Sequence, residues 1–397
     1  MGGDGMSEWK KVKLGEITNI KTGKLDSNAA VLNGAYPFFT CDPTTLSIDK
    51  WAYETEAILL AGNNASGNYT AKYYKGRFNA YQRTYIIETL NSKNASVRFM
   101  AYAMNQQLQL LKVMSSGSTT KFLTMKMLTN LLINLPTIQT QHRIEDILSR
   151  YDSLIDNYQK QIKLLEEAAQ RLYKEWFVDL RFPGYENTPM VDGVPEGWEK
   201  KKLGEIDCRI ESGSRPKGGI NKELTKGIAS IGAENVIGLG KYNYASEKFI
   251  DQDFFDKMKR GKLVDRDILI YKDGAYIGKT TLFQDKFPHE EAAVNEHVFL
   301  LHAKDESLQY FIFFTLYQKE YFEKMQKLNK NSAQPGINQT AIRSLEIMFP
   351  SKDIITSFND RVNLIVKNIF SIAKQIRLLT EARDRLLPKL MSGEIEV

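Results

Sequence analysis

Two groups of amide, basic and hydroxyl side chains stand in turn-rich stretches, one group in each half of the sequence. The first group comprises Asn63, Asn64, Ser66, Lys72, Arg77, Gln82 and Arg83. The second comprises Arg215, Lys217, Lys272, Tyr276, Lys279, Asn331 and Gln334. Asn, Gln and Arg side chains pair with the edges of nucleic-acid bases, whereas Lys and Ser suit phosphate oxygens. Any one such residue is ordinary in a solvated loop, so the prediction of DNA contacts depends on the two groups together.

Motifs for enzymatic chemistry are incomplete in this sequence. The two glycines of Gly274–Thr280 are separated by three residues. A phosphate-binding loop needs four residues between its glycines to wrap its N–H groups around the phosphate. We therefore predict that this segment is a turn between two strands. A zinc-binding helix with His289 as its first ligand would need its second ligand at position 293, which is Ala293. Asp265 and Asp267 are predicted to lie on a solvated strand edge. We therefore expect no catalytic residue, no metal site and no cofactor.

Composition limits the class of protein further. A chain of 397 residues with 42% hydrophobic and 26% charged residues suits two globular domains with connecting elements. Its apolar runs are too short for a membrane span. Only two cysteines occur, which favours a cytoplasmic protein without a disulfide framework. The net charge of +6 is a modest bias toward polyanionic partners.

The elements that would position the two groups are organised by a long helix that occurs twice. An apolar series at alternating gaps of four and three residues is typical of a coiled-coil seam. The first copy contains Ile144, Leu148, Tyr151, Ile155, Tyr158, Ile162 and Leu165. Adding 214 to each number gives Phe358, Val362, Ile365, Ile369, Ile372, Ile376 and Leu379. Arg383 interrupts the second series near its end, where we expect its guanidinium to reach water.

The globular segments before the helices also repeat. Trp9–Ile17 returns as Trp198–Ile206, an offset of 198 − 9 = 189, so the second unit holds 214 − 189 = 25 more residues. Ala57–Leu60 and Asp267–Tyr271 are predicted to be buried strands. Leu308–Met325 is predicted to be one helix. Short strands combined with a few helices favour an α+β class for each segment.

The predicted architecture is two pseudo-repeated globular domains held apart by a long intramolecular antiparallel two-helix coiled coil. Two equivalent units are expected to pack about a pseudo-twofold axis, which makes the helices antiparallel. Prolines at 136, 183 and 350 delimit the elements, and Pro388 is expected to end or kink the second helix. The expected limits are a first domain over 1–136, a central helix over 137–182, a linker and second domain over 183–350, and a C-terminal helix over 351–397.

Several stretches together resemble one known family over essentially the whole length. They are Pro195–Trp198 before Leu203–Ile206, the helix end Leu172–Phe177, and the segment Leu386–Ile395. With them the chain resembles the specificity (S) subunit of type I restriction–modification systems. The first unit departs from the pattern, because Ser7 and Glu8 precede Trp9 where the second unit has Pro-Glu-Gly.

The resemblance implies two target-recognition domains that read a bipartite DNA sequence with an unspecified spacer of fixed length. It also implies three kinds of partner: double-stranded DNA, two methyltransferase (modification) subunits that bring S-adenosylmethionine and act on adenine, and restriction/translocase subunits driven by ATP. Catalysis would belong to those subunits. The alternative is a coiled-coil protein-interaction scaffold without sequence-specific DNA binding, and an enzyme with an unrecognised site is a further alternative.

Overall fold

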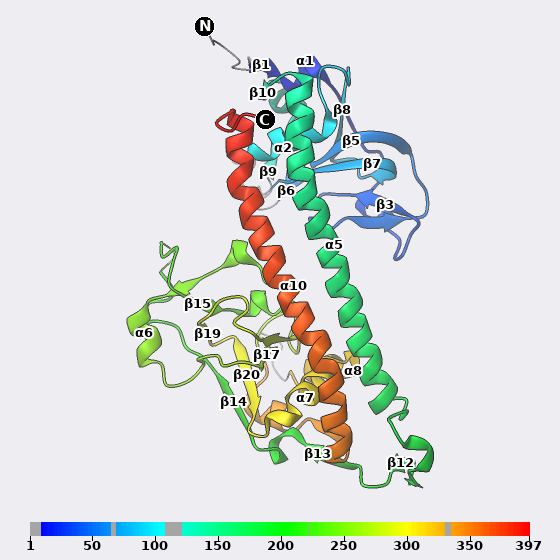
Figure 1. Ribbon diagram of the computed structural model, residues 1–397, viewed down its shortest axis with the longest axis vertical. Coiled ribbons are helices and arrows are strands. Elements are labelled where there is room, and N and C mark those ends of the chain that lie inside the picture. The colour runs from blue at the N-terminus through cyan, green and yellow to red at the C-terminus, as the bar shows by residue number, and fades with distance from the viewer. Residues whose placement is uncertain (1–8, 65–68, 108–120, 222, 330–334) are drawn as a thin grey trace. The chain divides into compact units, whose positions relative to one another are not determined.

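The computed structural model describes residues 9–64, 69–107, 121–221, 223–329 and 335–397. Two compact units divide the chain: Met1–Leu154 with Leu379–Val397 forms unit 1, and Ile155–Leu378 forms unit 2. Each unit contains β-strands, short helices and a length of each of two long helices (Figure 1). This mixture of strands and helices agrees with the predicted α+β class. None of the helices in these ranges is long and apolar enough to cross a membrane.

A six-stranded sheet in the order β2-β8-β5-β7-β3-β4 forms the centre of unit 1. Its neighbours pair antiparallel, except for the parallel pair β3 and β7. Side chains alternate between the faces, so Ile58 and Leu60 pack with helix α2 (Val97–Gln106), whereas Leu59 packs with Phe78 on the opposite face. The strands are β2 (Thr18–Thr22), β3 (Tyr36–Phe39), β4 (Leu46–Ile48), β5 (Tyr53–Ala61), β7 (Ala71–Ala80) and β8 (Thr84–Thr89).

Unit 2 contains a four-stranded sheet, β14-β20-β17-β18, and a three-stranded sheet, β16-β15-β19. The strand–turn–strand prediction is confirmed, because β17 and β18 flank the glycine-containing turn and pair antiparallel. The strands are β14 (Cys208–Ser212), β15 (Ile228–Ile231), β16 (Phe249–Ile250), β17 (Asp267–Tyr271), β18 (Thr280–Phe283), β19 (Ala292–Val294) and β20 (Val298–Ala303). The other short elements of this unit are η2 (Tyr185–Asn187), β11 (Met190–Val191), β12 (Val194–Pro195), η4 (Ala233–Asn235), η5 (Tyr244–Ser246), α6 (Gln252–Lys257) and η6 (Glu306–Leu308).

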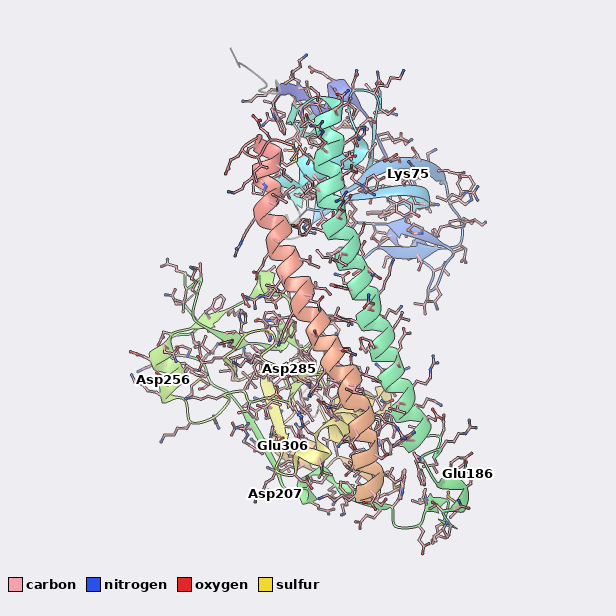
Figure 2. All side chains as sticks on the ribbon, in the orientation of Figure 1. Lys75, Glu186, Asp207, Asp256, Asp285 and Glu306 are labelled. Carbon is pink, nitrogen blue, oxygen red and sulfur yellow. The ribbon has the colours of Figure 1, made fainter. Side chains whose placement is uncertain are left out.

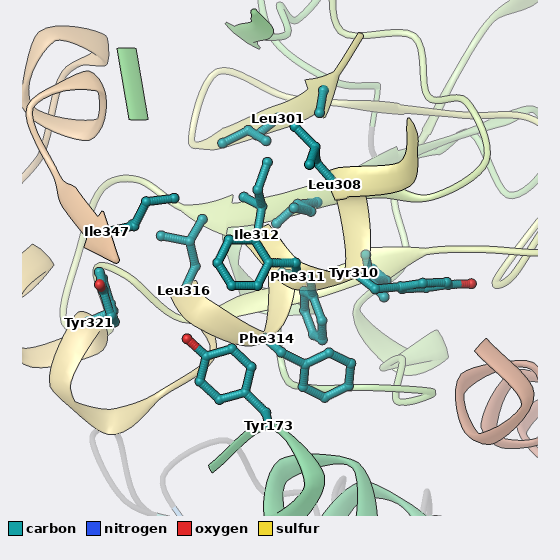
Figure 3. Packing of buried hydrophobic residues seen from close by; sticks show 14 of the residues in the cluster. Tyr173, Leu301, Leu308, Tyr310, Phe311, Ile312, Phe314, Leu316, Tyr321 and Ile347 are labelled. Atoms are coloured by element: carbon teal, nitrogen blue, oxygen red, sulfur yellow. The ribbon is translucent and has the colours of Figure 1, made fainter. Parts of the chain in front are cut away.

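The helix predicted over Leu308–Met325 is instead two helices, α7 (Gln309–Leu316) and α8 (Lys319–Lys327). Extended backbone at Gln318 separates them, and its side-chain Nε2 donates to the carbonyl oxygen of Phe314 at 3.0 Å. Helix α7 is apolar on every side and fully buried (Figure 3), whereas α8 is amphipathic. A single straight helix could not bury α7 all round and keep one face of α8 in water, so the break follows from the sequence pattern.

Two small antiparallel ribbons display the sequence repeat in the structure. Strand β1 pairs with β10, and their counterparts in the second repeat, β13 and β21, pair in the same way. Each ribbon is followed by one helical turn that packs on a second short helix. A Cβ on Gly15 would lie 2.8 Å from Thr129 Cβ, and one on Gly204 would lie 3.0 Å from Arg343 Cβ, so the close approach favours glycine at both equivalent positions. The elements are β1 (Lys10–Lys13), α1 (Leu14–Ile17), α4 (Met125–Thr129), β10 (Leu132–Leu135), β13 (Glu199–Lys202), η3 (Leu203–Glu205), α9 (Gln339–Arg343) and β21 (Glu346–Phe349).

The long helices are α5 (Ile138–Phe177) and α10 (Lys352–Ser392). All fourteen residues of the predicted seam are buried or half-buried, whereas Leu164 and Leu378, which lie off the seam at equivalent positions, are each 64% exposed. The four-and-three spacing therefore identifies part of the buried face of each helix, and α10 also buries Val366, Phe370 and Ala373 beside the predicted seam. Helix α10 continues past Pro388 to Ser392, so the proline does not end it. The lost backbone hydrogen bond is tolerated there because Leu390 and other neighbours are packed in the core of unit 1.

Candidate nucleic-acid interface

In unit 1, three chain segments meet just beyond the end of β5. Gly62 N–H donates to the carbonyl oxygen of Arg83 at 2.7 Å, and Leu123 N–H donates to the carbonyl oxygen of Gly62 at 2.8 Å. Asn63 pairs with Phe122 in the two-residue ladder of β6 (Asn63–Asn64) and β9 (Lys121–Phe122). We name this meeting point, with the adjacent Cys41, junction 1.

The same backbone pattern occurs in unit 2 beyond the end of β17. Lys272 N–H donates to the carbonyl oxygen of His297 at 3.0 Å, and Ile337 N–H donates to the carbonyl oxygen of Lys272 at 3.1 Å. Asp273 forms an isolated antiparallel bridge with Gly336, as Asn63 does with Phe122. Lys272 and Ile337 thus take the places that Gly62 and Leu123 take in unit 1. We name this second meeting point, with the adjacent Arg215 and Glu296, junction 2.

Among the described side chains of junction 1, a guanidinium lies beside a partly exposed aromatic ring. The Arg83 guanidinium lies 5.9 Å from the centroid of Phe122, whose side chain is partly exposed. Behind it, the Cys41 thiol donates to Asn63 Oδ1, and burial raises the pKa of this thiol. Neighbouring Gln82 uses its Nε2 to donate to Asp26 Oδ1 at 2.6 Å. Of the first predicted group, Asn63 and Arg83 are therefore the two that the fold brings together.

Junction 2 carries a chain of charged side chains. Arg215 Nε lies 2.9 Å from Glu296 Oε1, and His297 Nε2 lies 3.5 Å from the same oxygen. His297 Nδ1 is 3.2 Å from Asp273 Oδ2, which is also 3.4 Å from Lys272 Nζ. The Lys272 ammonium donates in addition to the carbonyl oxygen of Glu296 at 2.9 Å. The carboxylates of Glu296 and Asp273 offset the charges of Arg215 and Lys272, and His297 lies between the two carboxylates, so the network supplies directed donors rather than a strong positive field.

The turn after Lys272 adds an aromatic and basic pair. Lys279 Nζ lies 3.8 Å from the ring centroid of Tyr276, which is 54% exposed. Tyr271 supports that ring edge-on with the centroids 6.3 Å apart. Lys217, two residues beyond Arg215, is exposed and has no ion pair among the described residues. Arg215, Lys217, Lys272, Tyr276 and Lys279 therefore all lie on the loops that form or adjoin junction 2.

Two further predicted DNA contacts, Lys72 and Arg77, also have partners within their own domain. Lys72 Nζ donates to the carbonyl oxygen of Pro43 at 2.6 Å and lies 3.3 Å from Thr45 Oγ1, and burial lowers its pKa. Arg77 belongs to a row of cross-strand ion pairs along β5 and β7, where its Nε lies 3.1 Å from Glu54 Oε1; Lys75 of the same row is marked in Figure 2. Lys72 lies near the start of β7, and Arg77 lies five residues further along the same strand.

The remaining predicted contacts fall where side chains are not described. Ser66, Asn331 and Gln334 lie outside the described residues, and Asn64 is described only by its backbone in β6. The predictions for these four residues remain predictions.

Sequence reasoning missed Glu296 and Phe122, which shape the two junctions. Glu296 stands between Asn295 and His297, both polar, and that run was the available signal. Sequence reasoning also placed Asp267 on a solvated edge, and this is wrong. Its Oδ1 lies 2.9 Å from His302 Nδ1 and 3.3 Å from Arg209 Nη2, and the side chain is fully buried. These partners offset the cost of removing a carboxylate from water.

The described residues give these junctions the chemistry of a polar recognition surface. They present guanidinium, ammonium and aromatic groups at the ends of rigid strands, which suits contacts to base edges and phosphates. Within the described ranges, no group of three or more His, Cys, Asp or Glu side chains is arranged to hold a metal ion.

Comparison with known proteins gives consistent similarities. The family model described as type I restriction modification DNA specificity domain matches residues 6–167 and 195–385. The specificity subunit of the type I restriction enzyme EcoDI of Escherichia coli is 38% identical over 165 residues, which cover 42% of this chain and 35% of that protein. The MjaVIII specificity subunit of Methanocaldococcus jannaschii is 24% identical over 401 residues, covering 98% of this chain and 93% of that protein.

A solved structure shows the same fold. The crystal structure of a type I restriction–modification system S subunit from M. genitalium superposes with a TM-score of 0.60. The alignment covers 98% of each chain at 18% sequence identity, so the likeness lies in the fold rather than in individual side chains.

Proposed function

The chain belongs to the family of type I restriction modification DNA specificity domains, and on this premise we propose that it reads a bipartite DNA target. Its similar proteins are specificity subunits, so this chain is a DNA-recognition subunit and not itself an enzyme. The expected domain limits, 1–136 and 183–350 for two target-recognition domains, are part of the proposal.

The observation that carries the proposal is the pair of equivalent junctions. Two surfaces with the same backbone pattern, one in each repeat of the chain, suit the reading of two half-sites. Their side chains differ, with Arg83 and Phe122 at one and Arg215, Lys272 and Tyr276 at the other, so the two half-sites would differ in sequence. Base-edge contacts of about 1–3 kcal/mol each would supply discrimination, and phosphate contacts the general affinity.

The second part of the proposal is an antiparallel coiled coil of α5 and α10 that sets the spacer length. In unit 1 the N-terminal part of α5, with Ile144 and Leu148, shares a core with Leu390 near the end of α10. In unit 2 the C-terminal part of α5 shares a core with Phe358 and Val362 near the start of α10. Because the start of one helix packs with the end of the other in each unit, these contacts favour helices that run in opposite directions, with the predicted seam between them.

The partners in this proposal follow the type I scheme. Two methyltransferase subunits would supply S-adenosylmethionine and modify an adenine, and restriction/translocase subunits would supply ATP-driven translocation and cleavage. The net charge of +6 suggests that these subunits contribute much of the positive field around the DNA. If six Lys or Arg side chains contact phosphates, the log–log dependence of affinity on salt should have a slope of about −5.

A methylation map tests this function directly. The full chain is expressed with its methyltransferase subunits in a host free of other adenine methylation, and every methylated adenine is located by sequencing. We expect one motif with two specified parts and a spacer of constant length. The control is the same host with the methyltransferase subunits alone. A continuous motif, or no motif, would contradict the proposal and favour the scaffold alternative.

A further inference from the structure

The Nε side of the Arg215 guanidinium forms an ion pair with Glu296. Its Nε lies 2.9 Å from Glu296 Oε1, and this is the one partner that Arg215 has among the described residues. The side chain is 61% exposed, so the terminal Nη1 and Nη2 groups are open to a ligand. Arg215 comes from the segment after β14, which the hydrogen bond from Gly213 N–H to the carbonyl oxygen of Asn295 at 3.2 Å places beside Glu296.

Glu296 is placed to orient this arginine rather than to contact DNA itself. Its side chain is 29% exposed, and its Oε2 atom is enclosed without a hydrogen-bond partner among the described residues. Its other oxygen, Oε1, faces Arg215 and His297. The Glu296 carbonyl accepts from Lys272 Nζ at 2.9 Å, which ties the backbone of this turn to junction 2. Arg215 is the most exposed basic side chain of this network, at 61% against 47% for His297 and 24% for Lys272.

The free end of a guanidinium carries two parallel N–H donors. Guanine presents two adjacent acceptors, O6 and N7, in the major groove, whereas adenine presents an acceptor beside a donor, so a fixed pair of donors selects guanine. A lysine in the same place keeps the positive charge but cannot make the paired contact. An exposed ion pair contributes little to the free energy of unfolding, so stability alone does not account for the Arg215–Glu296 pair.

We infer that Arg215 reads a guanine in one half of the DNA target, and that Glu296 is a positioning residue that holds the Nη1 and Nη2 edge toward the base. This inference rests on the proposed function, because it names a base read by the same junction. It assigns the guanine to the half-site of unit 2 and makes no claim on the other half.

The test uses the complex of the full chain with its methyltransferase subunits and the bipartite motif found by methylation mapping. Duplexes carrying each single base-pair change are compared in binding at one fixed salt concentration. The wild-type complex should prefer one G·C pair by roughly 10- to 100-fold. R215K should lose most of this preference while keeping the others, and E296Q should reduce the preference at the same position only.

A matched control is Arg266→Lys. Arg266 also faces a glutamate, with its Nη1 3.8 Å from Glu306 Oε2, but it precedes β17 at the end opposite Lys272. R266K should leave all base preferences unchanged. Arg215 is exposed, so R215A should keep the thermal unfolding profile of the wild type and can replace R215K if lysine finds a new partner.

The outcomes separate this inference from the proposed function. If R215K and R215A keep every base preference, or weaken binding to all duplexes equally as expected for a phosphate contact, Arg215 does not read a base and the inference is wrong while the function stands. An E296Q variant that alters both half-sites would overturn the positioning role of Glu296. A wild-type complex without any base preference would overturn the proposed function together with the inference.

Discussion

Asp152 and Arg383 form a charged layer between α5 and α10 within unit 1. Arg383 Nη1 lies 2.8 Å from Asp152 Oδ1, and the Tyr102 hydroxyl donates to the other carboxylate oxygen. Arg383 thus has a protein partner, where the sequence had suggested an exit to water. The repeat-equivalent positions, 152 + 214 and 383 − 214, are Val366 and Ala169, which are buried in the apolar core of unit 2. One layer is therefore charged in the first unit and apolar in the second.

This difference gives a prediction for stability at the residue scale. Asp152→Val should leave the Tyr102 hydroxyl and Arg383 Nη1 without their acceptor, while Arg383 Nη2 keeps its contact with Asp384 Oδ1 at 2.8 Å. We expect unit 1 to be destabilised by about 1–3 kcal/mol. The double variant D152V/R383A copies the apolar pair of unit 2 and should recover part of that loss, because the two sites are in contact. Hydrogen exchange of unit 1 peptides in increasing urea measures both effects.

The control for this pair is Asp146→Val, since Asp146 is exposed on the same helix and has no ion pair among the described residues. Its effect should stay within about 0.5 kcal/mol. Strictly additive effects of D152V and R383A would show that the charged layer has no coupling.

At the scale of elements, α5 is attached to the globular part of unit 1, and α10 to that of unit 2, at equivalent residues. Glu145 Oε1 of α5 accepts from Phe99 N–H at 2.8 Å and from the Ser96 hydroxyl, at the start of α2. The repeat-equivalent residue of α10, Asn359, donates to the carbonyl oxygen of Ser307, just before α7. Hydrogen bonds of this kind fix the N-terminal part of α5 to the first domain and that of α10 to the second, so a change in helix length should be transmitted to the position of the domains.

A heptad insertion tests the proposed spacer function. Seven residues inserted after Ile155 and seven after Leu379, close to the two places where the long helices pass from one unit to the other, should preserve the seam. The helices would lengthen by roughly 10 Å at 1.5 Å per residue. The recognised spacer should then grow by up to about 3 base pairs at 3.4 Å each, with both half-sites retained. Methylation mapping reads the new motif.

Insertions of two residues at the same places provide the comparison. They rotate the apolar face away from its partner and should impair folding or assembly. A heptad variant that assembles and still recognises the original spacer would show that the helices do not determine the separation of the half-sites.

For the whole molecule, the repeated organisation predicts that the two recognition functions can be exchanged independently. Replacing residues 195–350 with the corresponding segment of another specificity subunit should change only the half-site read by unit 2. Strands β13 and β21 lie at the two ends of the exchanged segment and pair with each other, so the replacement brings both strands of this ribbon with it. Methylation mapping of the chimera, beside the parent, measures the result. A change in both half-sites would contradict independent reading.

The sequence alone determined the repeat, the two long helices and their buried faces, and the α+β class. These features depend on local periodicity, such as the four-and-three spacing of Ile144, Leu148 and Tyr151, which each helix satisfies independently of the rest of the chain. Prediction of the DNA-facing residues was less complete. The loops around Arg215 and Lys272 converge as expected, but these two side chains, like Lys72 and Arg77, also have partners within their own domain.

Only the tertiary structure decided which polar groups meet. Arg215 and Glu296 lie far apart in the sequence, and the pairing of β14 with β20 brings their segments together. The burial of Asp267 beside Arg209 and His302 likewise depends on three separate strands. The orientation of a polar side chain depends on partners distant in sequence, and a local pattern carries no information about them.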